Sequence, residues 1–204
     1  MEIRRIDGYD DPRFSRRALL QHGCFLIDGR PCEVEIISES EAVVRGCEPA
    51  QYDALTEEFR FYAPQITRFI DADGVPIRTD PPAELITVPL DRIQPSQFYV
   101  DRDKLRAVST FLSRSEDIII QVLPDGDRFI SLDGHTRLYY AVEMGWQTVR
   151  AVVSSSDDWV YPFVREARAR GVFAPKDMVP LSHGEYVEKW DRFCDALFAA
   201  QEPG

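Results

Sequence analysis

The sequence predicts a mixed α/β (α+β) fold in a chain that can bury its own core. Short runs rich in valine, isoleucine and phenylalanine alternate with stretches whose apolar residues recur at helical spacing. Asp-Gly pairs, which favour tight turns, punctuate these runs at Asp28-Gly29 and Asp133-Gly134. With 204 residues, 44% of them hydrophobic, the chain needs neither a disulfide framework nor a structural metal to fold.

Residues 1–85 predict a small α+β N-terminal lobe. The expected elements, in order, are a hairpin over 24–38, a strand over 42–45 and a helix over 49–70. We expect Pro64 to kink or divide that helix, because proline lacks the backbone N–H and clashes with the preceding turn. Asp, Gly and Pro residues crowd 71–85, and the boundary of the lobe is expected there.

Residues 86–154 predict the core of the protein, and 155–204 a helical extension. The elements expected in the core are a strand over 85–90, a loop over 93–96, a helix over 101–113, strands over 118–123 and 129–132, a helix over 135–144 and a strand over 148–153. The extension predicts two amphipathic helices, over 159–170 and 182–199, whose apolar stripes should pack on the body of the protein.

Charge and composition exclude several classes of function. The formal net charge of −11 disfavours nucleic acid, whose binding depends on Lys and Arg neutralising phosphates. No segment has the continuous apolar run of a membrane span or a signal peptide, so we expect a cytoplasmic protein with no membrane contact. The cysteines lack C-x-x-C spacing and should be reduced, and the three histidines are too dispersed for a readable zinc site.

The sequence SLDGHTR, residues 131–137, holds most of the polar chemistry of the core. In the simpler reading, Asp133 caps the following helix and Gly134 allows the turn. In the functional reading, helix N–H groups join His135, Thr136 and Arg137 in binding a phosphate or carboxylate, and Asp133 holds a divalent cation such as Mg²⁺. Four polar groups at one strand-to-helix junction exceed what capping requires, which favours an anion site.

From about residue 86 to 153 the chain resembles the ParB/sulfiredoxin superfamily and its ParB-like N-terminal domain. The order of elements carries this resemblance, together with DGHTR, which is similar to the D-G-H-x-R of ParB-like free-serine kinases and their relatives. In ParB the same junction reads G-E-R-R and binds CTP phosphates, and in sulfiredoxin a cysteine there repairs sulfinic acid. Because no cysteine lies between Cys47 and Cys194, sulfiredoxin chemistry is excluded.

The resemblance to the kinases also implies roles for individual residues. Asp133 would lie near the metal and the substrate hydroxyl as a catalytic residue with His135, and His135 and Arg137 would contact phosphates. Gly134 would let the phosphate approach the backbone, and Thr136 stands where those kinases can have a second histidine. Phosphoryl transfer depends mainly on this kind of positioning and charge neutralisation.

The chain departs from the kinase pattern in the loop after the first core strand. The kinases carry a catalytic glutamate there, and the equivalent position in this sequence is Gln97, which follows Ser96. Ser96 and Gln97 either contact substrate or cap the next helix. Because glutamine cannot accept a proton from a hydroxyl, a kinase would need another base, such as Asp101, Asp103 or Asp133.

Three functions follow from these observations. The first is a ParB-like protein that binds a nucleotide (ATP, ADP or CTP) and Mg²⁺ and phosphorylates a small, serine-like hydroxyl compound. The second is a non-catalytic nucleotide-responsive module that changes its contacts with a protein partner or within a homodimer. The third, a DNA-binding or nuclease role, is opposed by the acidic charge and by the absence of a recognisable helix-turn-helix.

Overall fold

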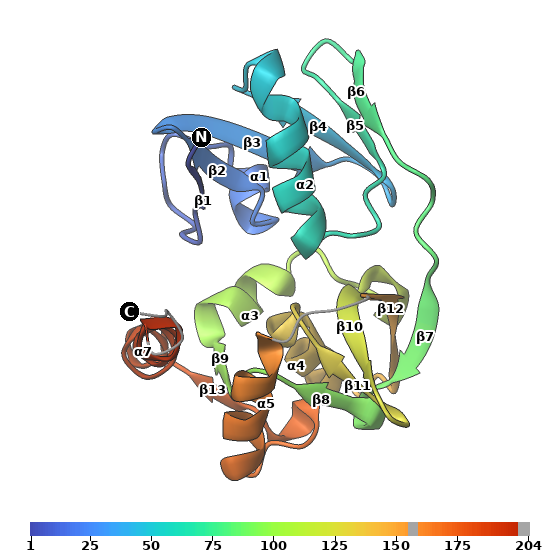
Figure 1. Ribbon diagram of the computed structural model, residues 1–204, viewed down its shortest axis with the longest axis vertical. Helices are drawn as coiled ribbons and strands as arrows, with labels where there is room; N and C mark the ends of the chain where they lie inside the picture. Colours follow the sequence, from blue (N-terminus) through green and yellow to red (C-terminus); the bar gives the residue numbers. More distant parts are fainter. Residues whose placement is uncertain (155–158, 200–204) are drawn as a thin grey trace. The chain divides into compact units, whose positions relative to one another are not determined.

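The computed structural model describes residues 1–154 and 159–199 and shows an α+β fold (Figure 1). The chain divides into two compact units, Met1–Leu85 and Ile86–Gly204. Each has its own sheet and its own buried apolar cluster. Among the described residues, no helix combines the length and apolar character required to cross a bilayer.

The first unit is a six-stranded sheet with two α-helices. Its elements are β1 (Ile3–Arg5), α1 (Arg16–Leu20), β2 (Cys24–Ile27), β3 (Arg30–Ile36), β4 (Glu41–Arg45), the short η1 (Pro49–Gln51), α2 (Tyr52–Tyr62), β5 (Arg68–Ile70) and β6 (Pro76–Thr79). The strands follow one another in chain order across the sheet, and every pair is antiparallel except β4–β5, which is parallel.

The expected hairpin and third strand of this unit are confirmed. Asp28 and Gly29 both have positive φ (49° and 81°), the conformation a two-residue hairpin turn requires. The expected helix over 49–70 is wrong in its second half, because α2 ends before Pro64 and Phe69 lies in β5 instead. Proline cannot continue the helix, and Phe69 contacts Phe59 of α2 in an edge-to-face pair within the core.

The second unit contains a five-stranded sheet, a separate pair of short strands, and helices. Its elements are β7 (Ile86–Pro89), η2 (Leu90–Arg92), β8 (Ile93–Pro95), β9 (Tyr99–Asp101), α3 (Arg102–Val108), η3 (Ser115–Asp117), β10 (Ile119–Asp125), β11 (Arg128–Ser131), α4 (His135–Glu143), β12 (Thr148–Val153), α5 (Val160–Ala169), η4 (Pro175–Asp177), β13 (Val179–Leu181), α6 (His183–Tyr186), the π-helical η5 (Val187–Asp191) and α7 (Arg192–Ala199).

Parallel strand pairs bring distant loops together in this unit. The sheet order is β7-β12-β10-β11-β8, and β8 runs parallel to β11 with Pro95 opposite Ser131. The segment 93–95, expected as a loop, is therefore an edge strand, where Pro95 is tolerated because an edge does not need every N–H. Since parallel strands end at the same edge, the chain after Pro95 lies beside the chain after Ser131.

A second parallel pair, β9 with β13, has the same consequence. Leu181 lies opposite Asp101, so the starts of α3 and α6 are neighbours although they are about eighty residues apart in sequence.

The C-terminal segment expected as a helix over 182–199 packs on the core as expected. Trp190 of η5 and Phe193 of α7 contact the buried Phe98, with ring centroids 4.9 and 5.1 Å from that of Phe98. These aromatic contacts attach the C-terminal segment to the core of the second unit.

We predict that Gly23→Ala destabilises the first unit by about 3 kcal/mol, a typical cost of overpacking. A Cβ atom at Gly23 would overlap the backbone carbonyl of Val34, which is fully buried in β3 and cannot move aside. Unfolding of this unit can be followed by the reactivity of its buried Cys24 and Cys32 thiols in increasing denaturant. Tryptophan fluorescence serves as the internal control, because all three tryptophans belong to the second unit and their transition should not move.

Candidate functional site

The strand-turn-helix predicted from SLDGHTR is present in the second unit. β11 ends at Ser131 and α4 begins at His135, with Gly134 as its N-cap at φ 79°. A Cβ at Gly134 would overlap the Ile120 side chain and lie 3.0 Å from the Arg137 guanidinium. Gly134 thus serves the backbone conformation and also the close packing of this junction.

The His135 side chain lies inside the protein and connects three segments. Its Nε2 atom is 3.3 Å from the Ser96 amide nitrogen, 3.0 Å from Ser96 Oγ and 3.1 Å from Ser131 Oγ. Ser96 Oγ in turn donates to the Ser131 carbonyl at 2.8 Å. This network joins the loop after β8, the end of β11 and the first turn of α4.

The network fixes the protonation state of His135. The Ser96 N–H can donate to Nε2 only when that nitrogen carries no proton, so we assign the neutral imidazole with its proton on Nδ1. Burial lowers the pKa of His135 from 6.5 to about 4, with Arg137 adding to the effect and Asp133 opposing it. At neutral pH the ring is therefore uncharged.

Asp133 and Arg137 form an ion pair across the start of α4. Arg137 Nη2 lies 2.7 Å from Asp133 Oδ2, and Arg137 Nη1 donates to the Ile119 carbonyl at 2.7 Å. The two side chains are 27% and 19% exposed, so both reach the surface of the junction. The Asp133 carboxylate and the Ile119 carbonyl thus both help to hold the guanidinium in place.

The start of α4 is built differently from the starts of α1, α3 and α6. Those helices are capped by the side chains of Ser15, Asp101 and Ser182, whereas no side-chain cap and no acidic residue is found in the first turn of α4. The first intrahelical bond of α4 is from the Leu138 N–H to the Gly134 carbonyl. The preceding N–H groups and the positive end of the helix dipole therefore face no carboxylate from their own helix.

The loop after β8 places Ser96 and Gln97 in different surroundings. Ser96 is buried and belongs to the His135 network. Gln97 Nε2 donates to the Tyr99 carbonyl and lies 3.2 Å from Tyr186 Oη on α6. Gln97 thereby connects the loop to the C-terminal segment, whereas the cap of the next helix, α3, is Asp101.

The alternative bases named from the sequence are also engaged. Asp101 is 1% exposed, accepts the Asp103 N–H at 2.8 Å and faces His183 Nδ1 at 2.8 Å, while Asp103 pairs with Arg106. The hydrogen bond to Asp101 raises the pKa of His183. The association of Asp101 with His183 was missed in the sequence, because it depends on the β9–β13 pairing and leaves no local pattern.

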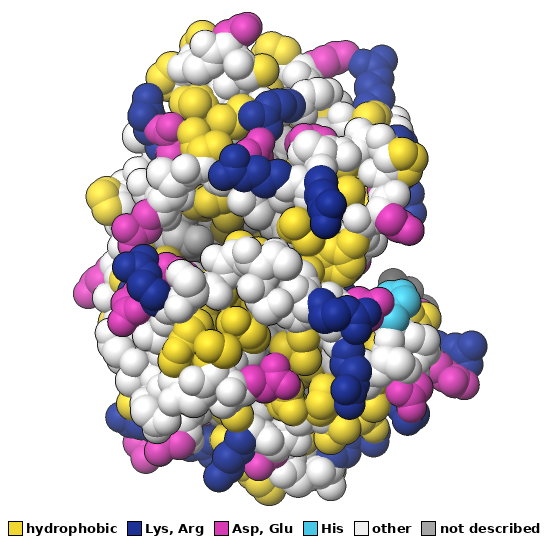
Figure 2. All heavy atoms as spheres, turned by 180° about the vertical axis from the view of Figure 1, so that it is seen from behind, with side chains coloured by type: hydrophobic (Ala, Val, Ile, Leu, Met, Phe, Trp, Pro, Cys, Tyr) yellow, Lys and Arg dark blue, Asp and Glu magenta, His cyan; other side chains and the backbone are white. Residues whose placement is uncertain are grey.

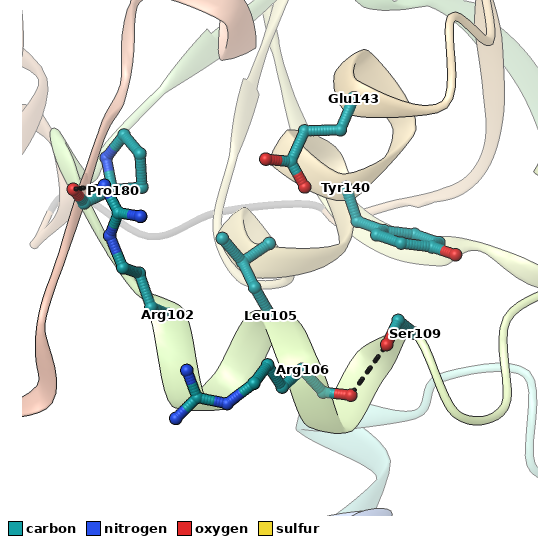
Figure 3. A pocket seen from close by; sticks show the side chains of 7 residues that line it. All are labelled: Arg102, Leu105, Arg106, Ser109, Tyr140, Glu143 and Pro180. Carbon is teal, nitrogen blue, oxygen red and sulfur yellow. Dashed lines mark hydrogen bonds between the residues drawn. The ribbon is translucent and has the colours of Figure 1, made fainter.

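A hollow of about 280 Å³ lies between α3 and α4 (Figure 3), and its lining does not include the DGHTR residues. It is lined by Arg102, Leu105, Arg106, Ser109, Tyr140, Glu143 and Pro180. In Figure 3, Glu143 and Tyr140 on α4 face the α3 side chains, and Arg102 extends along β13 toward the Pro180 carbonyl, 3.5 Å away. Because the lining contains both basic and acidic side chains, it does not indicate which class of ligand the hollow would bind.

On the face shown in Figure 2, acidic and basic side chains of the described residues are interspersed, and neither sign of charge forms a large patch. The core segment 86–154 holds 8 basic and 9 acidic residues, so it is nearly neutral within an acidic chain. An anion site there does not have to overcome the full net charge of −11.

All four cysteines are unpaired, and burial raises the pKa of Cys24 and of Cys194 to about 12, which disfavours thiolate chemistry.

Comparisons with known proteins give weak similarities. No family model matches the chain, and no curated protein matches it. Among solved structures, protein Atu1540 from Agrobacterium tumefaciens is similar at 18% identity and a TM-score of 0.31, over 47% of this chain and 53% of that one. Sulfiredoxin from Arabidopsis thaliana is similar at 14% identity and a TM-score of 0.31, over 40% of this chain and 97% of that one.

A conserved hypothetical protein from Pyrococcus furiosus is similar at 18% identity and a TM-score of 0.28, over 37% of this chain and 34% of that one. The matched part of this chain thus spans about half of the Agrobacterium protein and a third of the Pyrococcus protein. Similarities of this size leave the function to be argued from the residues themselves.

We predict that the second unit loses stability as the pH falls from 6.5 toward 4, because His135 is neutral when folded and gains a proton on unfolding. The pKa of His135 is lower in the folded than in the unfolded protein. Neutral His135 therefore contributes fully to the free energy of unfolding above pH 6.5, and this contribution is lost on acidification. The loss should be roughly 2 kcal/mol at pH 5 and on the order of 3 kcal/mol near pH 4. Denaturant unfolding followed by tryptophan fluorescence at pH 7.5 and 5 measures it.

The matched control is His135→Gln, which cannot titrate. Its stability should be lower than wild type at pH 7.5 and closer to wild type at pH 5. If the difference between the two proteins is the same at both pH values, His135 is not buried in the neutral form.

Proposed function

We propose that the second unit binds the phosphate groups of a nucleotide (ATP, ADP or CTP) with Mg²⁺ at the junction of β11 and α4. The start of α4 supports the proposal, because its N-cap Gly134 provides no side-chain cap and its first turn contains no acidic residue. The N–H groups of His135 and Thr136 and the guanidinium of Arg137 supply donors of the kind phosphate oxygens accept.

The metal fits the same junction in its chemistry. Asp133 offers a carboxylate oxygen, the ligand that Mg²⁺ prefers, and is partly exposed beside Arg137. Asp133 would hold the ion, which when bound would supply positive charge to neutralise the phosphates. His135 would then act through its neutral ring, by fixing the Ser96 loop at the edge of the site.

Thr136 provides the sharpest test of this proposal. Thr136→Glu places an acid in the first turn of α4, which should stabilise the helix by about 0.3–1 kcal/mol through the dipole. The same carboxylate should repel a phosphate and weaken nucleotide binding by about tenfold or more, equivalent to roughly 1.4 kcal/mol. Calorimetric titration of each protein with ATP, ADP and CTP in the presence of Mg²⁺ measures the affinities.

Thr136→Gln is the matched neutral control and should bind nearly as wild type. Arg137→Ala should also weaken binding strongly, although it removes partners from Asp133 and Ile119 and needs a stability measurement beside it. Wild-type protein that binds no nucleotide at millimolar concentration, or equal affinity of wild type and Thr136→Glu, would contradict the proposal.

Two uses of a bound nucleotide remain to be compared. A kinase acting on a serine-like hydroxyl requires a base, and Gln97 at the position of the kinase glutamate cannot be one. Asp101 is buried against His183, Asp133 pairs with Arg137, and Asp103 lies outside DGHTR in an exposed pair with Arg106. Because these contacts leave no evident base at DGHTR, they favour a nucleotide-responsive module that changes its contacts with a protein partner or within a homodimer.

We therefore expect nucleotide binding without phosphoryl transfer to small hydroxyl compounds. The measurement is ADP release from ATP and Mg²⁺ in the presence and absence of serine and other hydroxyl metabolites, alongside the sedimentation of the protein with and without nucleotide. Substrate-dependent ADP release would establish the kinase instead. Assembly that does not respond to any nucleotide would count against the module.

A further inference from the structure

Asp101, Asp103 and His183 form a cluster at the end of the β9–β13 pair, separate in sequence from DGHTR. One potential ligand atom from each residue lies within 4.8 Å of the other two. Asp101 and Asp103 belong to the start of α3, and His183 is the first residue of α6. The pairing of Leu181 with Asp101 sets this distance, so the cluster is held by the backbone of two parallel strands.

Capping accounts for only part of this arrangement. Asp101 caps α3 through Oδ1, which accepts the Asp103 N–H, but serine does the same for α1 and α6 without burying a charge. Asp101 is 1% exposed, and a buried carboxylate is costly unless a cation or several donors meet it. Its second oxygen faces His183 Nδ1, on a side chain that is 62% exposed.

Three permanently charged side chains lie near the cluster: Arg106 pairs with Asp103, the charge of Lys104 opposes the raised pKa of His183, and Arg102 has a partner outside the cluster. Arg102, next to Asp101 in the chain, extends toward the Pro180 carbonyl (Figure 3). Lys104 lies over the Tyr186 ring, with its nitrogen 5.5 Å from the ring centroid. Arg106 pairs with Asp103 and is 73% exposed, so this pair is a weak surface interaction that a competing cation can displace.

The donor set matches a metal ion with open coordination positions. One imidazole nitrogen and two carboxylate oxygens are ligands of Zn²⁺ and Mn²⁺, with metal–ligand bonds of about 2.0–2.2 Å that require only a small closure of the cluster. Imidazole favours first-row transition metals over Mg²⁺ and Ca²⁺, which prefer oxygen ligands. The exposed side of His183 leaves the remaining positions to water.

We propose that Asp101, Asp103 and His183 bind a first-row transition-metal dication and thereby attach the β13–α6 segment to the start of α3. The two carboxylates balance the charge of the ion, and the metal takes the place of the hydrogen bond between His183 and Asp101. This site does not depend on the proposed nucleotide function, because none of its ligands belongs to DGHTR. Its ligands come from both ends of the unit, so metal binding links the C-terminal segment to the core.

Mn²⁺ is the primary probe, because thiols bind Zn²⁺ and the chain has four unpaired cysteines. The full chain is treated with a chelator, freed of it, and titrated with Mn²⁺ without nucleotide while electron paramagnetic resonance counts the free ion. We expect one ion per chain at submillimolar concentration and a rise in the unfolding temperature. Asp103→Asn and His183→Ala should each weaken binding about tenfold or more and abolish that rise.

Two features of the variants keep the test decisive. Asp103 contributes its backbone N–H to the α3 cap, so Asp103→Asn leaves the cap intact and carries the test if His183→Ala folds poorly. Glu188→Gln removes an exposed carboxylate from the same C-terminal segment, outside the cluster, and should bind Mn²⁺ as wild type does.

The proposal is overturned by no Mn²⁺ binding at millimolar concentration, by binding that survives Asp103→Asn, or by equal weakening in Glu188→Gln. Mg²⁺ titrated in the same way should bind at least about tenfold more weakly, and equal affinity would overturn the assignment to a transition metal. Failure of Mn²⁺ binding leaves nucleotide binding at DGHTR intact, since the Thr136→Glu titration reads that site alone.

Discussion

The neutral ring of His135 is the interaction on which the candidate site depends. Its Nε2 atom accepts from the Ser96 backbone and contacts both serine hydroxyls, so one side chain fixes the ends of two parallel strands and the start of a helix. Protonation would place a donor where the Ser96 N–H already donates, and would put a charge in a buried position. The low pKa of His135, about 4, keeps the network intact at neutral pH.

This constraint determines what remains to bind an anion. With the His135 ring inside and Gly134 packed against Ile120, the surface of the junction consists of backbone N–H groups, Thr136 and the Asp133–Arg137 pair. Backbone donors at a helix start lose no side-chain entropy on binding, and the ion pair holds a guanidinium beside them in a fixed position. In the nucleotide proposal, the junction would therefore bind phosphate through preorganised donors and with little net charge of its own.

Local sequence predicted the parts of the fold that local chemistry determines. The Asp28-Gly29 hairpin and the strand-turn-helix around Gly134 follow from residues that tolerate positive φ, and both are confirmed. The strand β8 was missed because Pro95 signals a loop, and only the pairing with β11 makes an edge strand of it. The internal position of the His135 ring could not be predicted, since Ser96 reaches it only through that pairing.

The two proposed sites, one for an anion and one for a cation, share one feature: in each, a parallel strand pair leads into a helix start. After β11, α4 begins with glycine and no acid, which leaves the helix dipole to attract an anion. After β9 and β13, α3 and α6 begin with acids in their first turns. The dipole explains why carboxylates lie there, but it explains neither the burial of Asp101 nor the histidine set against it. In the metal proposal those two features act together, because a dication needs carboxylates held in place, and a nitrogen ligand from His183 once the ion has displaced its proton.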